Sequence, residues 1–321
     1  MTSPLVAGVD LGGTNISAVV LGPGDAILGA DRRPTPRRAG PDEVPATIAA
    51  SVHAAIATAG CDPRDVVAVG IGCPGQVDRA AGTIGNATIL PDLPDAFPLA
   101  EVVSSHLSRP VLIDNDVRLA VAAELQAGAG SNFPSFLGVF LGTGVGAGLV
   151  LDGRLWHGRG NAGEFGHMVV EMDGRECVCG RRGCVEAYCG RAAMEREARA
   201  RAADGRTTAL FDMMEFSDRD RLTSSVWVQA VAADDSLAVS LVTEAQRALG
   251  AGLASVANLL DLDGFILGGG LATQLGEPFL AGVKEEMLAR VLAGRPPEIR
   301  MTALADLSGS VGAAMLAREA V

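Results

Sequence analysis

Aromatic residues and lysine are scarce in this chain. Only 4% of its 321 residues are aromatic, so a core must be built mainly from alanine, valine and leucine. Lys284 is the only lysine, and it follows Val283. The Gly-Lys-Ser/Thr sequence of a Walker-type phosphate loop is therefore absent, which excludes an NTPase of that class.

Basic charge is also in deficit. The chain has 26 lysine and arginine residues against 38 aspartate and glutamate residues, a net charge of −12. Proteins that bind nucleic acids or anionic membranes normally present a basic face. We therefore expect neither a nucleic-acid partner nor membrane docking.

A secretory signal and a long apolar run are missing as well. Residues 1–10 contain neither a basic segment nor a long apolar one. The longest apolar run, 136–151, is short for a membrane span and contains five glycines, which favours a buried pair of strands. Six cysteines without a signal predict reduced thiols rather than a disulfide framework. We expect a cytoplasmic protein.

The chain does contain a repeat. Residues 8–21 and 138–151 both follow the pattern strand, glycine turn, strand, and six of their fourteen aligned positions are identical. A duplicated unit predicts two similar α/β halves, and the length fits about two domains. Chance similarity between two glycine-rich hairpins is the alternative. No linker rich in proline or serine separates the halves, so a hinge is expected near Asp116 and near the C-terminus.

Hydrophobic patterning places the expected elements around these hairpins. Further strands are expected at 26–32, 66–71, 110–113 and 264–267. Helices are expected at 44–59, 99–107, 117–127, 237–260, 279–292 and 311–318, with a helical stretch over 191–214.

Three glycine-rich turns follow predicted strands. Glycine lets several backbone N–H groups converge on a phosphate. Asp10, at the end of a buried strand, is a candidate for holding Mg²⁺ through water. Each turn alone is more often a tight hairpin, but three at strand ends predict a nucleotide site. The candidate cofactor-binding residues are Asp10, Gly12, Gly13, Thr14, Asn15, Gly142, Thr143, Gly144, Gly268, Gly269 and Gly270.

Four residues have the spacing of a metal site. Nine residues separate His167 from Cys177, which is followed by Cys179, and four residues separate Cys179 from Cys184. One nitrogen and three sulfur ligands form a closed tetrahedral site, so a structural Zn²⁺ is predicted. Exposed free thiols are the alternative, although they would be vulnerable to oxidation. Cys189 is not expected to be a fifth ligand.

Acidic residues mark a candidate catalytic site. Asn115 and Asp116 lie where an apolar strand meets a helix, so Asp116 could accept a hydroxyl proton while Asn115 orients the substrate. Simple helix capping is the alternative. Glu164 and Glu186 flank the predicted metal loop, which would hold them rigidly as hydroxyl acceptors; ordinary loop acids are the alternative.

Together these motifs resemble the ROK family of sugar kinases and sugar-responsive repressors, over nearly the whole chain. The most specific element is Gly166-His167 followed by residues 177–186, which is similar to the family's zinc signature. The resemblance implies that residues 10–15 and 141–146 are phosphate motifs and that 268–270 approaches the nucleoside. It also implies that Asp116 is the general base and that Asn115, Glu164, His167 and Glu186 bind sugar.

The resemblance implies an α/β fold of the actin-like ATPase type, with two ribonuclease-H-like domains around a cleft and a zinc-binding insert. We expect a smaller domain of residues 1–116 plus 308–321, and a larger one of 117–307 with the zinc loop at 164–190. The implied reaction transfers a phosphoryl group from ATP, with Mg²⁺, to a hexose, most readily O6 of glucose. A dimer or tetramer is also implied.

Several alternatives stay open. The sugar could be N-acetylmannosamine, N-acetylglucosamine or fructose, and polyphosphate could replace ATP. A non-catalytic sugar sensor or a filament-forming ATPase fits less well, and a repressor would need a DNA-binding segment before Leu5. Two departures from the family pattern bear on sugar identity: Val117-Arg118 after the Asn-Asp pair, where Arg118 could pair with Asp114, and residues 90–93.

Overall fold

The computed structural model describes residues 4–36, 41–85, 94, 96–217, 219–292, 294, 296–304 and 307–321. The chain divides into two compact units. The first comprises residues 1–127 and 306–321, and the second comprises residues 128–305.

The first unit is built on a mixed five-stranded sheet with the order β3-β2-β1-β4-β7. Strands β1, β2 and β3 pair antiparallel, whereas β4 and β7 continue the sheet parallel to β1. The strands span Leu5–Leu11 (β1), Asn15–Leu21 (β2), Ile27–Pro34 (β3), Val66–Cys73 (β4) and Val111–Asn115 (β7). A separate hairpin joins β5 (Gln76–Asp78) to β6 (Thr83–Gly85).

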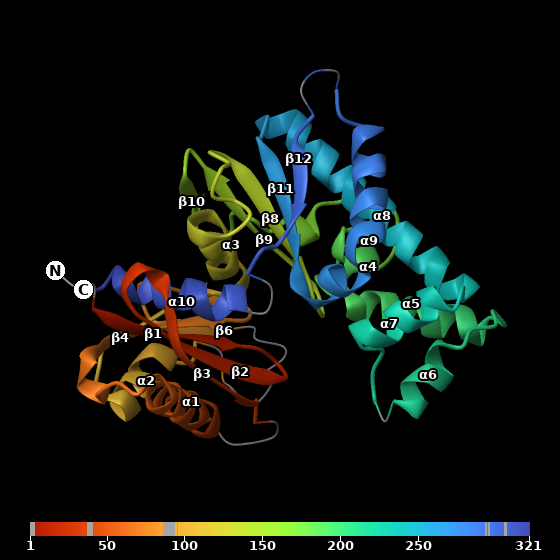
Figure 1. Cartoon of the computed structure of the whole chain (residues 1–321). Helices are drawn as coiled ribbons and strands as arrows, with labels where there is room; N and C mark the ends of the chain where they lie inside the picture. Colours follow the sequence, from red (N-terminus) through yellow and green to blue (C-terminus); the bar gives the residue numbers. More distant parts are fainter. Residues whose placement is uncertain are drawn as a thin grey trace. The chain divides into compact units, whose positions relative to one another are not determined.

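Helices cover both faces of this sheet (Figure 1). Helices α1 (Glu43–Ala59) and α2 (Leu99–Leu107) bury valine, isoleucine and leucine side chains against one face. Helix α10 (Ser308–Arg318) lies on the other face, and α3 (Asp116–Ala127) packs on α10 through Leu119, Ala313 and Leu316. Because α3 is packed in this way, the first unit extends past Asp116 to include it.

The second unit has a sheet with the order β10-β9-β8-β11-β12. The strands span Phe136–Leu141 (β8), Val145–Leu151 (β9), Arg154–Trp156 (β10), Gly264–Gly268 (β11) and Glu298–Met301 (β12). Strands β8, β9 and β10 pair antiparallel, and β11 and β12 extend the sheet parallel to β8. Order and directions match those of the first sheet, so the duplication predicted from the two hairpins is confirmed.

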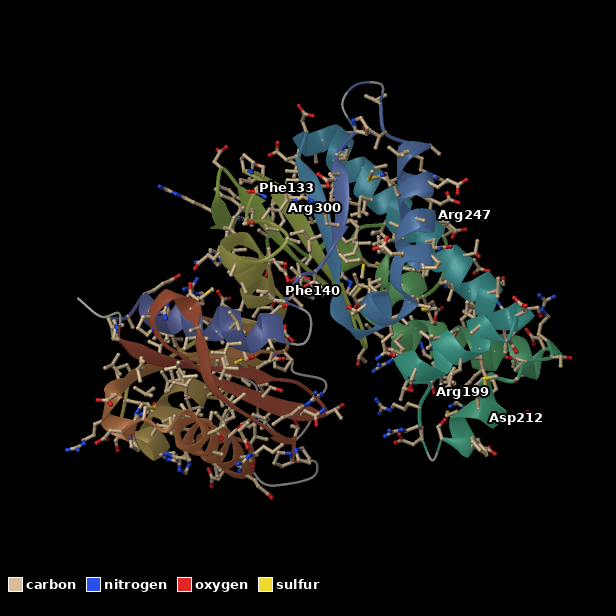
Figure 2. The ribbon with its side chains drawn as sticks, viewed as in Figure 1. Phe133, Phe140, Arg199, Asp212, Arg247 and Arg300 are labelled. Carbon is tan, nitrogen blue, oxygen red and sulfur yellow. The ribbon has the colours of Figure 1, made fainter. Side chains whose placement is uncertain are left out.

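Helices of the second unit surround a core that includes the fully buried Trp227. They are α4 (Glu186–Cys189), α5 (Arg191–Ala203), α6 (Leu210–Phe216), α7 (Ser224–Ala232), α8 (Ser236–Leu260) and α9 (Gly269–Leu288). The long helix α8 packs against α9, and the Asp235 side chain caps α8 by accepting a hydrogen bond from Ala238 N. On β12, the guanidinium of Arg300 lies 4.1 Å from the ring centre of Phe133 (Figure 2).

Some predicted boundaries were wrong. The helix expected at 279–292 begins at Gly269, and a kink at Gly276, where φ is +65°, hides its continuity in the sequence pattern. The helical stretch expected over 191–214 is broken after α5, and Gly205 adopts a φ of +93° there. Helix α7 was not predicted, although Thr223 caps it by accepting from Val226 N.

Helix length and composition also bear on membranes. In the part of the chain that the structure describes, no single helix is long and apolar enough to cross a bilayer. The pair α7 and α8 passes that test only when taken together, with a bend of 114° between them.

Candidate functional site

The carboxyl ends of three parallel strands bring acidic residues together in the first unit. In the register of the sheet, Asp10 on β1 pairs with Gly72 on β4, which pairs with Asp114 on β7. Cys73 pairs with Asn115 one position further. Ligand sites of open α/β sheets lie outside this edge. The predicted base, Asp116, follows directly as the first residue of α3.

Asp116 has the electrostatic surroundings of a proton acceptor. Burial of its carboxyl group and the nearby negative charge of Asp10 raise the pKa of Asp116 to about 7. Its Oδ1 accepts a hydrogen bond from Val117 N at 2.8 Å, which orients the carboxylate. Asn115 caps α3, since its Oδ1 accepts from Arg118 N at 3.2 Å. A carboxyl group with a pKa near neutrality suits general base catalysis.

The neighbouring Asp114 has a different role. It is fully buried, and its two carboxylate oxygens lie 3.1 Å from the guanidinium of Arg79 and 3.5 Å from that of Arg118. Its Oδ1 also accepts from Asn115 N at 2.7 Å. The pairing of Arg118 with Asp114, considered from the sequence, is therefore present. The other departure from the family pattern, residues 90–93, lies outside the described residues.

The first glycine turn lies beside Asp10 and is closed by hydrogen bonds. Gly12 N donates to Asn15 O at 3.0 Å, and Thr35, the residue after β3, donates through its hydroxyl to Gly12 O at 2.6 Å. A Cβ atom at Gly309, near the start of α10, would lie 2.8 Å from Cγ of Asp10. The absence of that atom leaves room for the Asp10 carboxylate, so Gly309 supports the candidate Mg²⁺ residue. Neither Thr35 nor Gly309 was found from the sequence.

The second glycine turn, Gly142 to Gly144, follows β8 in the second unit. Gly142 N donates to Gly144 O at 2.9 Å, and Glu186 Oε2 accepts from Val145 N at 2.8 Å. A Cβ atom at Gly144 would lie 2.4 Å from that same Glu186 oxygen, so the contact requires glycine. The side chain of Glu186 therefore holds the turn in place through Val145 N.

The third glycine segment lies against the second turn. Gly268 ends β11, and Gly269, with φ of +82°, begins α9. A Cβ atom at Gly269 would lie 2.5 Å from Leu141 O, at the end of β8. The second unit thus gathers two of the three predicted phosphate and nucleoside segments at the carboxyl edge of its sheet.

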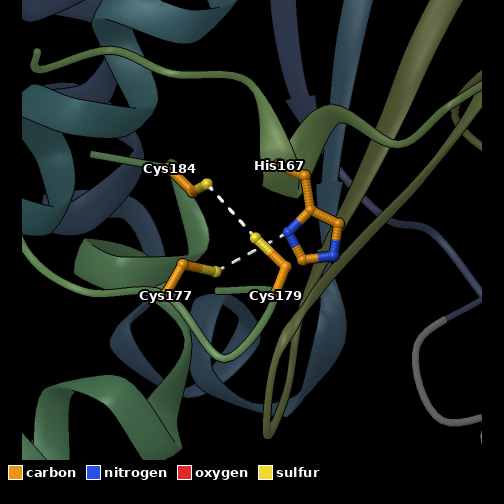
Figure 3. A group of neighbouring side chains, drawn as sticks. All are labelled: His167, Cys177, Cys179 and Cys184. Atoms are coloured by element: carbon orange, nitrogen blue, oxygen red, sulfur yellow. Dashed lines mark hydrogen bonds between the residues drawn. The ribbon is translucent and has the colours of Figure 1, made fainter. Parts of the chain in front are cut away.

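The predicted metal ligands form one cluster (Figure 3). Candidate ligand atoms of His167, Cys177, Cys179 and Cys184 all lie within 4.8 Å of one another. Cys177 Sγ is 3.7 Å from His167 Nδ1, and Cys179 Sγ is 3.7 Å from Cys184 Sγ. Zinc–sulfur bonds of about 2.3 Å in a tetrahedron place two sulfur atoms about 3.8 Å apart, so these separations fit Zn²⁺.

Cys189 lies outside this cluster, as expected. Its Sγ is buried and donates to Ala245 O at 3.2 Å. All four candidate ligands come from η3 (Phe165–His167) and the loop that precedes α4. Within that loop, Gly180 and Gly183, with φ of +82° and +77°, turn the backbone around the cluster.

Two of the three predicted sugar-binding residues of the second unit belong to this cluster or contact it. His167 is one of its members, and Glu186 Oε1 lies 3.8 Å from Cys177 Sγ. Glu164 stands at the N-terminal end of η3, and its backbone oxygen accepts from His167 N at 3.0 Å. The carboxylate of Glu186 thus contacts both the cysteine cluster and the second glycine turn.

With this geometry, comparison with known proteins is informative. The ROK family model matches residues 6–320, and the chain belongs to the ROK family. The glucokinase of Streptomyces coelicolor is 34% identical over 321 residues, covering 98% of each chain. An N-acetylgalactosamine kinase of Shewanella is 32% identical over 323 residues, covering 96% of this chain and 95% of its own.

A solved relative has the same fold along its length. The ROK family glucokinase of Streptomyces griseus, determined in complex with glucose and AMPPNP, is 34% identical. It superposes with a TM-score of 0.82, covering 98% of this chain and 99% of that one. The α/β architecture with two mixed sheets is therefore that of a ROK sugar kinase.

Proposed function

We propose that this protein is an ATP-dependent hexose kinase that converts glucose to glucose 6-phosphate. The observation that carries the proposal is Asp116, a carboxylate with a pKa near 7 at the carboxyl edge of the first sheet. Likeness along the full length to glucokinases of two Streptomyces species supports glucose as the substrate.

The candidate site residues of both units have parts in this reaction. Asp116 accepts the proton of the sugar hydroxyl as the hydroxyl oxygen bonds to the terminal phosphorus of ATP and ADP leaves, and Asn115 orients the sugar. The turn of Gly12, Gly13, Thr14 and Asn15 binds the phosphates of the nucleotide. In the second unit, Gly142, Thr143 and Gly144 hold phosphate, and Gly268 to Gly270 approach the nucleoside. Glu164 and Glu186 accept hydrogen bonds from sugar hydroxyls, and His167, whose Nδ1 faces the cysteine cluster, donates to a sugar hydroxyl through Nε2–H.

Two metal ions fit the residues present. Mg²⁺, when bound, neutralises the charge of the phosphates, and the Asp10 carboxylate beside Gly309 has the position and charge to hold it. Zn²⁺ fits His167, Cys177, Cys179 and Cys184, whose spacing leaves no open position and so gives the ion a structural role.

We infer further that the two units are the ribonuclease-H-like halves of an actin-like ATPase fold. Their matching strand orders and directions support this. The hairpins β1–β2 and β8–β9 carry the two predicted phosphate turns at equivalent places, as expected of a duplicated nucleotide-binding unit.

A coupled assay tests the function directly. Formation of the sugar phosphate is measured with ATP or polyphosphate as donor and with glucose, mannose, fructose and the N-acetylated hexosamines as acceptors. We expect the highest kcat/KM with ATP and glucose. A preference for an N-acetylhexosamine would reassign the acceptor, and transfer to none of the sugars would refute the kinase.

A further inference from the structure

Arg191 occupies a position that the family motifs leave without a role. It is the first residue of α5, and only α4 and Gly190 separate it from the loop that carries the cysteine cluster. Its backbone N donates to Gly142 O at 3.1 Å, and the next residue, Ala192, donates to Thr143 O at 3.0 Å. The start of α5 is therefore fixed on the second glycine turn.

The side chain of Arg191 spans two segments of the candidate nucleotide site. Its Nη2 donates to Thr143 Oγ1 and its Nη1 to Ser224 Oγ, both at 3.3 Å. Ser224 in turn lies beside the third glycine segment, since its Oγ is 3.7 Å from the place of a Cβ atom at Gly270. The guanidinium thus lies between the turn assigned to phosphate and the start of α9.

The positive charge of this group has no carboxylate bonded to it. Within the described ranges, no aspartate or glutamate oxygen lies within 4.0 Å of its nitrogens. The nearest acid on its helix, Glu195, is bonded to Arg199 at 2.7 Å and to Leu222 N at 3.1 Å. Burial lowers the pKa of Arg191, the negative charge of Glu195 raises it, and the like charge of Arg221 lowers it, but an arginine stays protonated at neutral pH.

Such an arginine is suited to bind an anion. A partly buried guanidinium whose partners are only two hydroxyl groups retains N–H donors and an unneutralised charge. Planar N–H donors match phosphate oxygens closely. The two hydroxyls that it contacts, Thr143 and Ser224, hold its position without cancelling its charge.

We propose that Arg191 binds a phosphate group of the nucleotide at the turn of Gly142 to Gly144. This rests on the proposed function, because the anion is the phosphate of the phosphoryl donor or product. Arg191 thereby adds a charged contact to a turn that otherwise offers backbone amides and one hydroxyl.

Calorimetric titration of the full chain with ADP and with adenosine tests this, because only ADP carries phosphate. Arg191→Met removes the charge and keeps the aliphatic stem, and Arg191→Lys restores the charge. Arg196→Ala, an exposed arginine on the same helix, is the matched control. Melting temperatures of all variants are measured alongside.

We expect Arg191→Met to weaken ADP binding by about 10- to 100-fold, the usual effect of a charged hydrogen bond, with adenosine affinity within about twofold. Arg191→Lys should recover part of the loss, and Arg196→Ala should change neither affinity. In steady state the KM for ATP should rise while the KM for glucose stays unchanged.

An equal loss of ADP and adenosine affinity in Arg191→Met would mean a purely structural role and overturn the proposal, as would no loss at all. The outcome is separable from that of the proposed function. A chain that binds ADP through Arg191 but phosphorylates no sugar refutes only the kinase, whereas a wild-type chain that binds neither ligand refutes both.

Discussion

Glu186 Oε2 accepts a hydrogen bond from Val145 N at 2.8 Å, while its other oxygen lies 3.8 Å from Cys177 Sγ. One carboxylate therefore joins the cysteine cluster to the turn that we assign to phosphate. Under the proposed function the same residue accepts a sugar hydroxyl, so sugar binding and phosphate binding share a side chain.

Substitution of Glu186 tests this shared role. Glu186→Gln keeps an oxygen for Val145 N but loses the charge, and we expect a higher KM for glucose with a nearly unchanged KM for ATP. Glu186→Ala removes the contact with the turn as well, so both KM values should rise, each by roughly tenfold, the value of one to two charged hydrogen-bonding contacts. Equal effects of the two variants would contradict the arrangement.

Replacement of Asp116 separates catalysis from sugar binding. Asp116→Asn keeps the acceptor for Val117 N but cannot take a proton, so we expect kcat to fall by about 10²- to 10⁴-fold with sugar binding retained. Turnover reduced by this factor, with normal glucose binding by calorimetry, is the expected pair of results. Near-normal turnover would remove Asp116 from the role of base.

The same variant should be more stable at high pH. A carboxyl pKa raised to about 7 means that the folded state disfavours the ionised form, so wild-type stability falls as pH rises from the ordinary carboxyl pKa to that value. The neutral amide of the variant carries no such cost. The unfolding free energy of Asp116→Asn relative to wild type should be about 1 to 3 kcal/mol higher at pH 8.5 than at pH 4. This is less than the whole pKa shift would give, because the side chain is partly exposed. Urea unfolding at both pH values measures the difference.

The pH profile of the wild-type enzyme follows from the same group. A general base acts when deprotonated, so kcat/KM for glucose should decline below about pH 7, by about tenfold per unit well below it. The residual activity of Asp116→Asn should lack this inflection. A wild-type profile flat from about pH 5 to 8 would show that Asp116 ionises at an ordinary carboxyl pKa.

Metal analysis tests the cysteine cluster. Protein purified without chelators should contain about one zinc per chain, the stoichiometry of a single closed site. Cys184→Ser should lose the metal and become less stable to heat, whereas Cys61→Ser, which alters a cysteine outside the cluster, should keep it. Full zinc content in Cys184→Ser would remove that residue from the ligand set.

Local sequence patterns selected most of the candidate site residues, but they could not indicate contacts between residues far apart in the sequence. Asp10 and Asp116 were found because each lies at the end of an apolar strand, where hydrophobic patterning is strong. The histidine and the three cysteines of the cluster were selected from their spacing, and the structure brings them together. The contacts of Arg79 with Asp114 and of Arg191 with Thr143 join residues far apart in sequence, so neither periodicity nor spacing could indicate them.

The fold shows the same limit. Strand and helix types were predicted well where apolar residues alternate or recur, and α2 was predicted with its observed ends, Leu99 and Leu107. Helix α9 was predicted too short because its first turns contain glycines that belong, by composition, to a loop. Its start is set by the contact of Gly269 with Leu141, which only the folded sheet provides.

Asp114 gives a final test, of stability rather than chemistry. Its fully buried carboxylate lies against Arg79 and Arg118, so Asp114→Asn removes the negative charge that both guanidinium groups face. We expect unfolding free energy to fall by about 3 to 5 kcal/mol, the usual cost of breaking a buried ion pair from one side.

Asp62→Asn is the matched control, since the Asp62–Arg64 pair is exposed to solvent and should contribute nothing measurable. A compensating substitution sharpens the test: Asp114→Asn combined with Arg118→Met should be less destabilised than Asp114→Asn alone, because one buried positive charge has been removed together with the negative one. If the two substitutions were instead additive, the pairing of Arg118 with Asp114 would carry no coupling energy, and Arg118 would be available to act on the substrate.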